Sequence, residues 1–147
     1  MKAIIPIGGR GTRMRPITFS QNKHFIPVGN KMLIEYPIQT IVDAGIHEIA
    51  ITYNPSQLKY AQDIIGDGSK WGANISYILQ PEPLGLANIY EVCEEWVGDD
   101  SFVLHLGDNI FTAGIKDFVD YFQAYKPNGL IADGTPPGKY SVRRTLF

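Results

Sequence analysis

The segment from Gly8 to Pro16 contains the residue types that bind phosphate. Its sequence is GGRGTRMRP, with three glycines and three arginines. Glycines let the backbone adopt positive φ and approach a ligand closely, and successive N–H groups then form a concave anion site. Guanidinium groups bind phosphate oxygens through paired hydrogen bonds. The segment therefore indicates a phosphate site, for which the available cations are Arg10, Arg13, Arg15 and, further along, Lys23.

Two common phosphate-binding motifs do not describe this segment. A Walker A loop ends in Gly-Lys-Ser/Thr, and a dinucleotide-binding loop has the spacing GxGxxG; neither is found here. The alternative interpretation is a solvated loop with incidental arginines. We favour phosphate binding because so many cations follow the first predicted strand in a chain of net charge −2.

Two further segments carry candidate binding residues. Asp108 lies in LGDN, directly after an apolar run, where one carboxylate could hold Mg²⁺ together with phosphate oxygens. Asp followed by Asn is equally good turn chemistry, and the spacing does not separate the two interpretations. Gln80 begins the loop QPEPLGLA and offers a donor and an acceptor that suit the edge of a base. Gly85 of that loop would let a flat ring lie against the backbone.

Apolar runs and helical periodicities alternate along the chain and predict the elements that must position these residues. Pro37 falls within the first predicted helix, so that helix either begins near Tyr36 or kinks there. Asn54 followed by Pro55 predicts the start of the second helix. Strands are predicted over residues 2–7, 49–53, 75–79, 102–106 and 129–132. Helices are predicted around residues 34–42, 54–65, 86–97 and 115–122.

This alternation predicts an α/β fold, with a Rossmann-like, mostly parallel sheet flanked by helices. Parallel sheets bind ligands beyond the carboxyl ends of their strands. That rule selects the loops at 8–29, 80–86 and 107–114, which contain the candidate residues above.

Composition excludes several classes of protein. The 147 residues suit one domain, and the hydrophobic fraction of 44% is too high for a disordered chain. The net charge of −2 argues against a nucleic-acid partner. No apolar run is long enough to cross a membrane, and the N-terminus does not read as a signal peptide. A single cysteine excludes an internal disulfide, so we expect a reducing, cytoplasmic location.

Several other conspicuous residues are better explained by packing. Cys93 lies on the apolar face of a predicted helix, and His105 alternates within a predicted strand. The histidines His24, His47 and His105 lack the spacing of a metal site. Trp71 and Trp96 are also expected to pack in the interior.

Taken together, five segments resemble the sugar nucleotidylyltransferases, specifically the glucose-1-phosphate thymidylyltransferases. They occur in the order and spacing of that family and cover about residues 1–130. The segments are GGRGTRMRP at 8–16, NKHFIPVGNKMLIEYPI at 22–38, GDGSKWG at 66–72, QPEPLGLA at 80–87 and LGDNIF at 106–111. The resemblance implies a fold of the nucleotide-diphospho-sugar transferase type and the transfer of dTMP from dTTP to a sugar 1-phosphate, with release of pyrophosphate.

The resemblance also implies a role for each matching residue. Arg13 would stabilise the pyrophosphate leaving group, Lys23 would bind the α-phosphate, and Asp108 would hold Mg²⁺. The residues implied to cradle the nucleotide are Gly8, Gly9, Gly11, Thr12 and Arg13, and those implied to read the pyrimidine are Gln80 and Gly85. Another pyrimidine triphosphate, UTP or CTP, remains an alternative to dTTP because related families share much of the first loop.

The chain departs from the family at three points. Pro6-Ile7 replaces the usual Leu-Ala, and Ser141 replaces a glycine that contacts the sugar in the family. The family's Glu-Lys-Pro segment and second metal-binding aspartate are missing, because its chains are about twice as long. The chain is thus either the nucleotide half of an enzyme or a nucleotide-binding module without independent activity.

The final residues form a separate unit in this prediction. Residues 1–132 make up the nucleotide-binding domain, and residues 133–147 an atypical tail. A parallel sheet that stops after its fifth strand leaves an open edge and an uncovered apolar face. We therefore expect either self-association into a homo-oligomer or the addition of residues 139–146 as an extra strand.

Overall fold

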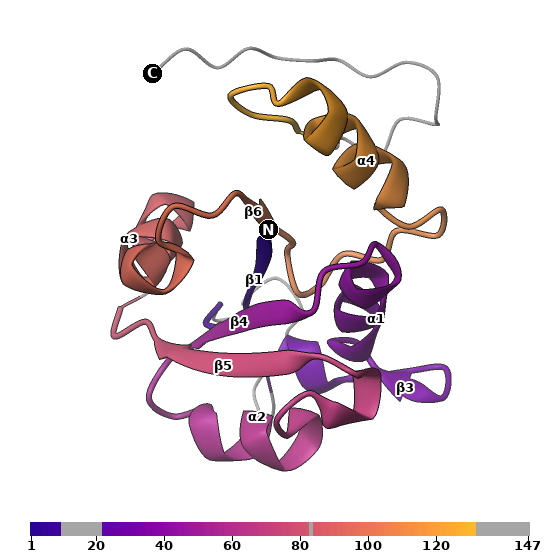
Figure 1. Ribbon diagram of the computed structural model, residues 1–147. Helices are drawn as coiled ribbons and strands as arrows, with labels where there is room; N and C mark the ends of the chain where they lie inside the picture. The colour runs from indigo at the N-terminus through magenta and orange to yellow at the C-terminus, as the bar shows by residue number, and fades with distance from the viewer. Residues whose placement is uncertain (10–21, 83, 132–147) are drawn as a thin grey trace.

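A computed structural model describes residues 1–9, 22–82 and 84–131 of the chain. Four parallel strands form its main sheet, in the order β5-β4-β1-β6, and β2 and β3 form a separate two-stranded antiparallel hairpin (Figure 1). The strands are β1 (Lys2–Pro6), β2 (Pro27–Val28), β3 (Lys31–Met32), β4 (Glu48–Tyr53), β5 (Asn74–Leu79) and β6 (Phe102–Leu104). The helices are α1 (Glu35–Asp43), α2 (Leu58–Ile65), α3 (Leu86–Val97) and α4 (Lys116–Tyr125), with short 3-10 turns η3 (Lys23–Phe25) and η4 (Ser69–Trp71).

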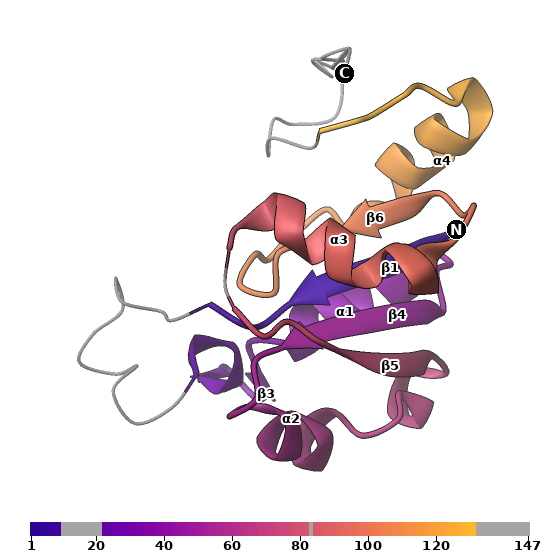
Figure 2. The same cartoon turned by 90° about the vertical axis from the view of Figure 1, so that its left-hand side faces the viewer.

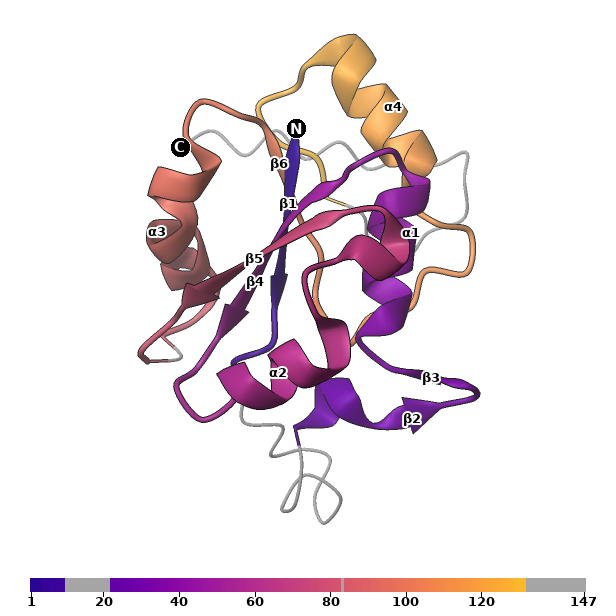
Figure 3. The same cartoon turned by 60° about the horizontal axis from the view of Figure 1, so that its bottom comes forward.

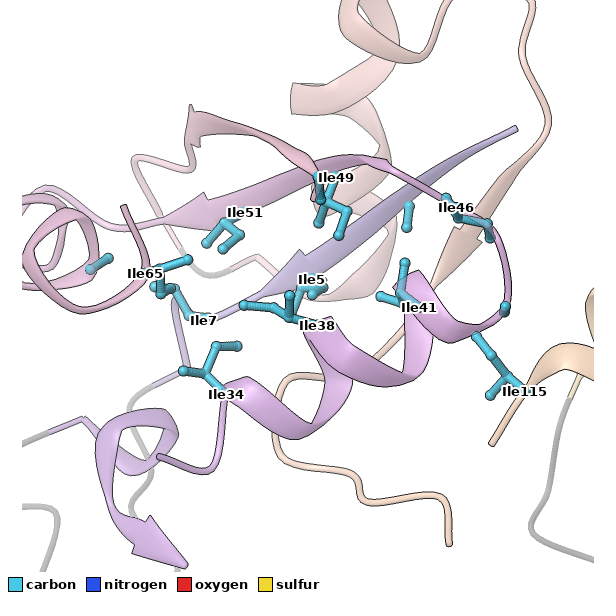
Figure 4. Close-up of a cluster of buried hydrophobic side chains, with 14 of the residues drawn as sticks. Ile5, Ile7, Ile34, Ile38, Ile41, Ile46, Ile49, Ile51, Ile65 and Ile115 are labelled. Atoms are coloured by element: carbon cyan, nitrogen blue, oxygen red, sulfur yellow. The ribbon is translucent and has the colours of Figure 1, made fainter. Parts of the chain in front are cut away.

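The helices cover the two faces of the sheet unequally. Figure 3 shows α3 on one side of the sheet and α1 on the other. Strand residues alternate between the faces, so Ile4 and Ala50 pack with α3 while Ile5 and Ile51 pack in the larger core. That larger core also contains buried residues of α1, α2 and α4, and isoleucine dominates it (Figure 4). The predicted parallel sheet flanked by helices is confirmed.

Pro37 causes no kink in α1. The helix begins at Glu35, which places the proline in the first turn. N–H groups of the first turn have no partner within the helix, so a proline there removes no hydrogen bond. The prediction that the helix begins near Tyr36 is therefore correct to within one residue.

The predicted start of the second helix is wrong. Helix α2 begins at Leu58, and the preceding residues form a turn in which the Gln57 N–H donates to the Asn54 carbonyl (3.0 Å). The side chain of Asn54 does not cap the helix. Its Nδ2 donates to the carbonyl of Gly8 (3.3 Å) and its Oδ1 accepts from Ser56 (2.8 Å), so this residue connects α2's leading turn to the end of β1.

The fifth strand predicted at residues 129–132 is also wrong in the part that can be assessed, because residues 129–131 are not in a strand. A strand needs a hydrogen-bonded neighbour, and apolar composition alone does not provide one. The hairpin of β2 and β3 was missed, although Gly29-Asn30 between them is a recognised two-residue turn signal.

The residues assigned to packing are buried or partly buried. Cys93 and His105 are buried, and burial raises the pKa of the Cys93 thiol to about 11. Trp71 and Trp96 pack against the two cores. Among the described residues, no helix is both long enough and apolar enough to span a membrane.

Candidate active site

The candidate site lies where the parallel strands end. Because β1, β4, β5 and β6 run in the same direction, the loops that follow them gather at one edge of the sheet (Figure 2). These loops carry Gly8 after β1, Asn54 after β4, Gln80 after β5 and Asp108 after β6. These four residues therefore lie along one edge of the sheet. It is the edge at which parallel sheets bind their ligands.

Lys23 and Asp108 meet at this edge, near the ends of β1 and β6. The Lys23 ammonium donates to Oδ2 of Asp108 in a close ion pair, although the two residues are 85 positions apart. Their side chains are 20% and 32% exposed, so solvent reaches both partners. The stem of Lys23 also runs past the first loop, since a Cβ on Gly9 would lie 3.9 Å from the Lys23 Cε.

Asn22 holds Lys23 in this position. Its Nδ2 donates to the carbonyl of Ile7 (2.8 Å), and its Oδ1 accepts from the backbone N–H of His24 (2.9 Å). The carbonyl of His24 in turn accepts from the N–H of Ile34 (2.8 Å), just before α1. The short η3 turn is therefore tied both to the end of β1 and to the start of α1.

His24 fills the space between η3 and the loop that carries Asp108. Its ring is buried, and Nδ1 lies 2.6 Å from Oδ1 of Asn22. Since that oxygen accepts, Nδ1 carries the hydrogen. Gly107 approaches the ring so closely that a Cβ there would lie 2.7 Å from the His24 Cδ2 and 3.0 Å from the Pro6 carbonyl. Only glycine permits this approach.

Burial leaves His24 neutral at neutral pH, and Lys23 keeps Asp108 ionised. Burial, with a smaller contribution from the Lys23 charge, lowers the pKa of His24 to about 4, against the opposing effect of Asp108. Burial raises the pKa of Asp108, but the hydrogen bond and charge of Lys23 outweigh it and leave this pKa below its ordinary value. The site therefore presents the Lys23 ammonium beside the Asp108 carboxylate.

The turn interpretation of Asp108 is confirmed, and its role in holding Mg²⁺ stays a prediction. It lies in a turn, in which the Asn109 N–H donates to the Leu106 carbonyl (3.1 Å), and its ionised carboxylate faces the edge where phosphate is expected. Among the described residues there is no group of three His, Cys, Asp or Glu side chains that could hold a metal. Mg²⁺ needs only one or two carboxylates when phosphate oxygens complete its coordination, so Asp108 fits a shared cation.

Gln80 lies beside the first glycine. A Cβ on Gly8 would lie 3.0 Å from the Gln80 Oε1, so this glycine makes room for the amide. The Gln80 side chain is only 4% exposed, and its Nε2 donates to Oδ1 of Asn88 (3.0 Å). Its backbone N–H donates to the Tyr53 carbonyl (2.8 Å), which fixes the loop to β4. Gln80 and Gly8 are thus brought together as one patch of the site.

Other predicted site residues are not brought into this cluster. Gly85 precedes α3 with φ +101°, is exposed, and has no described atom within 4 Å of its Cβ position. Arg10, Gly11, Thr12, Arg13 and Arg15 lie outside the described residues. The sequence did not indicate that Asn22, Asn54 and Asn88 belong to this site. His24 was considered only as a metal ligand and was excluded by its spacing. An Asn directly before Lys23 is a weak signal that no periodicity distinguishes.

A sequence model of the family described as nucleotidyl transferase matches residues 2–140. The chain belongs to the nucleotidyl transferase family. It is 42% identical over 124 residues to the low-salt glycan biosynthesis nucleotidyltransferase Agl11 of Haloferax volcanii, covering 84% of this chain and 35% of that protein. It is 39% identical over 131 residues to a glucose-1-phosphate thymidylyltransferase of Streptomyces griseus, covering 87% of this chain and 36% of that protein.

Solved structures of the family have the same fold. A structure from Bacillus anthracis, named as a glucose-1-phosphate thymidylyltransferase in complex with a sucrose, superposes with a TM-score of 0.82 at 35% identity. The match covers 86% of this chain and 52% of that one. A UDP-glucose pyrophosphorylase complexed with UDP-glucose has a TM-score of 0.69 at 23% identity, covers 85% of this chain and 54% of that one, and supports the fold alone. The chain spans about a third of the length of the curated relatives it matches.

We expect Gly107→Ala to lower the free energy of unfolding by about 1–3 kcal/mol, because the added methyl must displace the His24 ring or the Pro6 carbonyl. Urea unfolding monitored by circular dichroism measures the change. Gly129→Ala is the matched control, since nothing lies within 4 Å of its Cβ position. Equal stability of the two variants would show that Gly107 is not closely packed.

We expect the protein to lose stability as the pH falls from about 6.5 to about 4. In the unfolded chain His24 binds its proton near its ordinary pKa of 6.5, whereas in the folded protein it does so only near 4. The loss attributable to His24 reaches up to about 3 kcal/mol. Urea unfolding at a series of pH values should give a shallower decline for His24→Gln than for the parent. Identical slopes would contradict the assigned burial of a neutral His24.

Proposed function

We propose that this chain is the nucleotide-binding part of a sugar-phosphate nucleotidyltransferase that transfers dTMP from dTTP to glucose 1-phosphate and releases pyrophosphate. The observation that carries the proposal is the meeting of Lys23 and Asp108 beside Gly8 and Gly9, at the carboxyl edge of a parallel sheet. Membership of the nucleotidyl transferase family supports the reaction class. Similarity to glucose-1-phosphate thymidylyltransferases supports the choice of substrates.

The proposed reaction needs no nucleophilic side chain. A phosphate oxygen of the sugar 1-phosphate attacks the α-phosphorus of dTTP, and the bond from that phosphorus to the oxygen bridging to the β-phosphate breaks. The electron pair of that bond leaves with pyrophosphate. Catalysis then depends on alignment of the two phosphates and on stabilisation of negative charge as it spreads over their oxygens.

Lys23 is the described residue suited to that stabilisation. The hydrogen bonds of Asn22 fix the backbone that carries Lys23, and Asp108 holds its ammonium. A cation positioned in advance stabilises developing charge without reorganising. In the proposal its Nζ binds an oxygen of the α-phosphate, and Arg13, which lies outside the described residues, binds the departing pyrophosphate. Gly8 and Gly9 leave the backbone open to the triphosphate.

Asp108 is the residue that would hold Mg²⁺. The cation, when bound, would neutralise charge on the phosphate oxygens. The ion pair with Lys23 keeps this carboxylate ionised and aimed at the same edge, so each partner is ready for one component of a magnesium–nucleotide complex. A phosphate oxygen would accept from the Lys23 ammonium, and Mg²⁺ would bind the Asp108 carboxylate.

The patch formed by Gly8 and Gln80 is the proposed base subsite. The buried amide of Gln80 is oriented by Asn88, which accepts from its Nε2 at 3.0 Å. Nε2 carries two hydrogens, so one can donate to Asn88 while the second donates to a pyrimidine carbonyl. Gly85 is not part of this patch, since no described atom lies within 4 Å of its Cβ position at the start of α3.

A nucleotide-binding module without independent activity is the second candidate. It is favoured by one observation, namely that the chain spans only about a third of the curated relatives it matches. The Lys23–Asp108 site would then bind magnesium triphosphate, while the sugar phosphate and the transfer step would depend on further residues.

A pyrophosphate-release assay with the chain, dTTP, Mg²⁺ and glucose 1-phosphate separates the two candidates. We expect turnover for the enzyme and nucleotide binding without turnover for the module. If turnover is seen, Lys23→Ala and Asp108→Asn should each lower it by about 10²-fold or more, because each removes a charge that faces the phosphates. Lys116→Ala is the matched control, since Lys116 forms an exposed ion pair with Asp120 on α4.

The same variants keep the proposal testable if no turnover is seen. Calorimetric titration with magnesium dTTP should then show weaker binding for Lys23→Ala than for Lys116→Ala. Binding unchanged by Lys23→Ala and by Asp108→Asn, together with no effect of either on turnover, would reject this edge as the nucleotide site.

We expect dTTP to bind more tightly than ATP, because the chain is similar to glucose-1-phosphate thymidylyltransferases and the amide of Gln80 can pair with the edge of a pyrimidine. Titrating the protein with dTTP, UTP, CTP and ATP by calorimetry in the presence of Mg²⁺ measures the preference. Gln80→Ala should reduce the difference between dTTP and ATP, whereas Gln123→Ala, on α4, should leave it unchanged. Tighter binding of ATP than of dTTP would reject the pyrimidine assignment.

A further inference from the structure

The outer edge of β6 has no partner strand among the described residues. The Ser101 carbonyl accepts from the Lys2 N–H (2.9 Å), and the His105 N–H donates to the Ile4 carbonyl (3.0 Å), both across to β1. Because backbone groups alternate between the two sides of a strand, Phe102 and Leu104 direct their N–H and C=O groups to the opposite, outer side. This edge therefore offers donors and acceptors for one more strand.

An apolar groove runs along the same edge. It has a volume of about 720 Å³ and extends from β6 to α4 and to the last described residues. Figure 2 shows α4 lying beyond β6, away from β1 and β4. The groove residues used below are Leu86, Leu104, Leu106, Phe118, Phe122 and Ile131.

Parts of the groove wall are unusually exposed for apolar side chains. Leu86 is 55% exposed, Leu104 37% and Ile131 57%. Contiguous exposed apolar surface marks an interaction site more often than isolated residues do. A free strand edge bordered by such surface is the arrangement that accepts an added strand, since backbone hydrogen bonds and side-chain burial then act together.

His105 provides an independent sign that the groove takes a polar partner. Its ring lines the groove and its side chain is buried, yet its Nε2 has no hydrogen-bond partner among the described residues. Nδ1 lies 2.9 Å from the Leu106 carbonyl, an acceptor, so Nδ1 carries the hydrogen and Nε2 is an acceptor. A donor brought by an occupant would satisfy this atom.

We propose that residues 139–146 of this same chain occupy the groove and pair with the outer edge of β6. Ile131, which lines the groove, is the last described residue, so the chain continues from the groove itself. Residues 132–138 can span up to about 25 Å when extended, whereas a three-residue strand such as β6 is only about 10 Å long. The connection is thus long enough to turn back along the edge.

The composition of this segment suits the position. Its sequence is KYSVRRTL, in which Tyr140, Val142, Arg144 and Leu146 fall on one side of an extended strand. A long arginine side chain can pack its stem on apolar surface while its charge stays in water. Hydroxyl donors are available from Tyr140, Ser141 and Thr145 for the unpartnered acceptor of His105.

A tethered segment also has an advantage over a second copy of the protein. A short flexible connection gives the segment an effective concentration in the millimolar range at its site. A second copy at micromolar concentration would have to displace it, and would bring a tethered segment of its own. The proposal concerns an edge and a groove distinct from Lys23 and Asp108, and it does not depend on the proposed function.

Amide hydrogen exchange of the full chain, resolved by residue, tests the proposal. We expect the Phe102 and Leu104 amides of the parent to exchange about tenfold or more slowly than unstructured amides. Val142→Asp should abolish that protection, because a charge cannot be buried on the apolar side of the segment. Thr135→Asp adds the same charge within the connection and should preserve it.

Sedimentation velocity at the same protein concentrations completes the test. The proposal is supported if the protein is monomeric and the Phe102 and Leu104 amides lose their protection from exchange in Val142→Asp but not in Thr135→Asp. Unprotected Phe102 and Leu104 amides in the parent would overturn it. Protection that rises with protein concentration and survives Val142→Asp would also overturn it, and would identify a second copy as the occupant. Circular dichroism verifies that both variants retain the fold.

Discussion

The pairing of Lys23 with Asp108 is the interaction on which the site depends. It joins two segments 85 positions apart, and it can form only because β1 and β6 are adjacent and parallel. The loops that follow the two strands then leave the sheet on the same side. In another strand order the same two side chains would lie at different places along the edge. The topology of the sheet therefore creates the charge pair, and the pair locates the chemistry.

The charge pair itself contributes little to the stability of the fold. Both side chains are partly exposed, and ion pairs in contact with solvent typically contribute about 1 kcal/mol or less. Rigidity comes instead from the neutral groups around the pair, in particular the Asn22 bridge to Ile7 and the close contact of Gly107 with His24. A pair that is firmly positioned but weakly bound suits the proposed function, because phosphate and cation can replace its partners at small cost.

Local patterns predicted the four helices and the four strands of the parallel sheet, but not the start of α2 or the β2–β3 hairpin. They also identified Lys23, Asp108, Gly8 and Gln80, since each follows an apolar run or belongs to a motif. The remaining errors concern interactions between distant segments. Asn54 was read as a helix cap because its neighbour is proline, whereas its amide donates to the carbonyl of Gly8. Such a choice between two partners is decided by the assembled sheet and leaves no local signal.

The burial of His24 and its neutral state could not be predicted from the sequence either. A histidine next to a lysine has no periodicity that predicts burial, and its neutral state follows only from the assembled site. The need for glycine at position 107 likewise follows from the His24 ring and the Pro6 carbonyl, which are remote in the sequence. The sequence motifs pointed to Lys23 and Asp108, but not to the neutral Asn22 and His24 that hold the segment carrying Lys23 in place.

Strand β6 links the site to the open edge of the sheet. Its carboxyl end leads through His105 and Gly107 to Asp108, while its outer side lacks a partner among the described residues. Among the described residues its only partner strand is β1, over a register of three residues. A strand that pairs with the outer side would restrain β6 on both sides. It would thereby limit the movement of the loop that carries Asp108. The apolar groove and the charged site differ in the groups they present, yet the position of β6 determines the geometry of both.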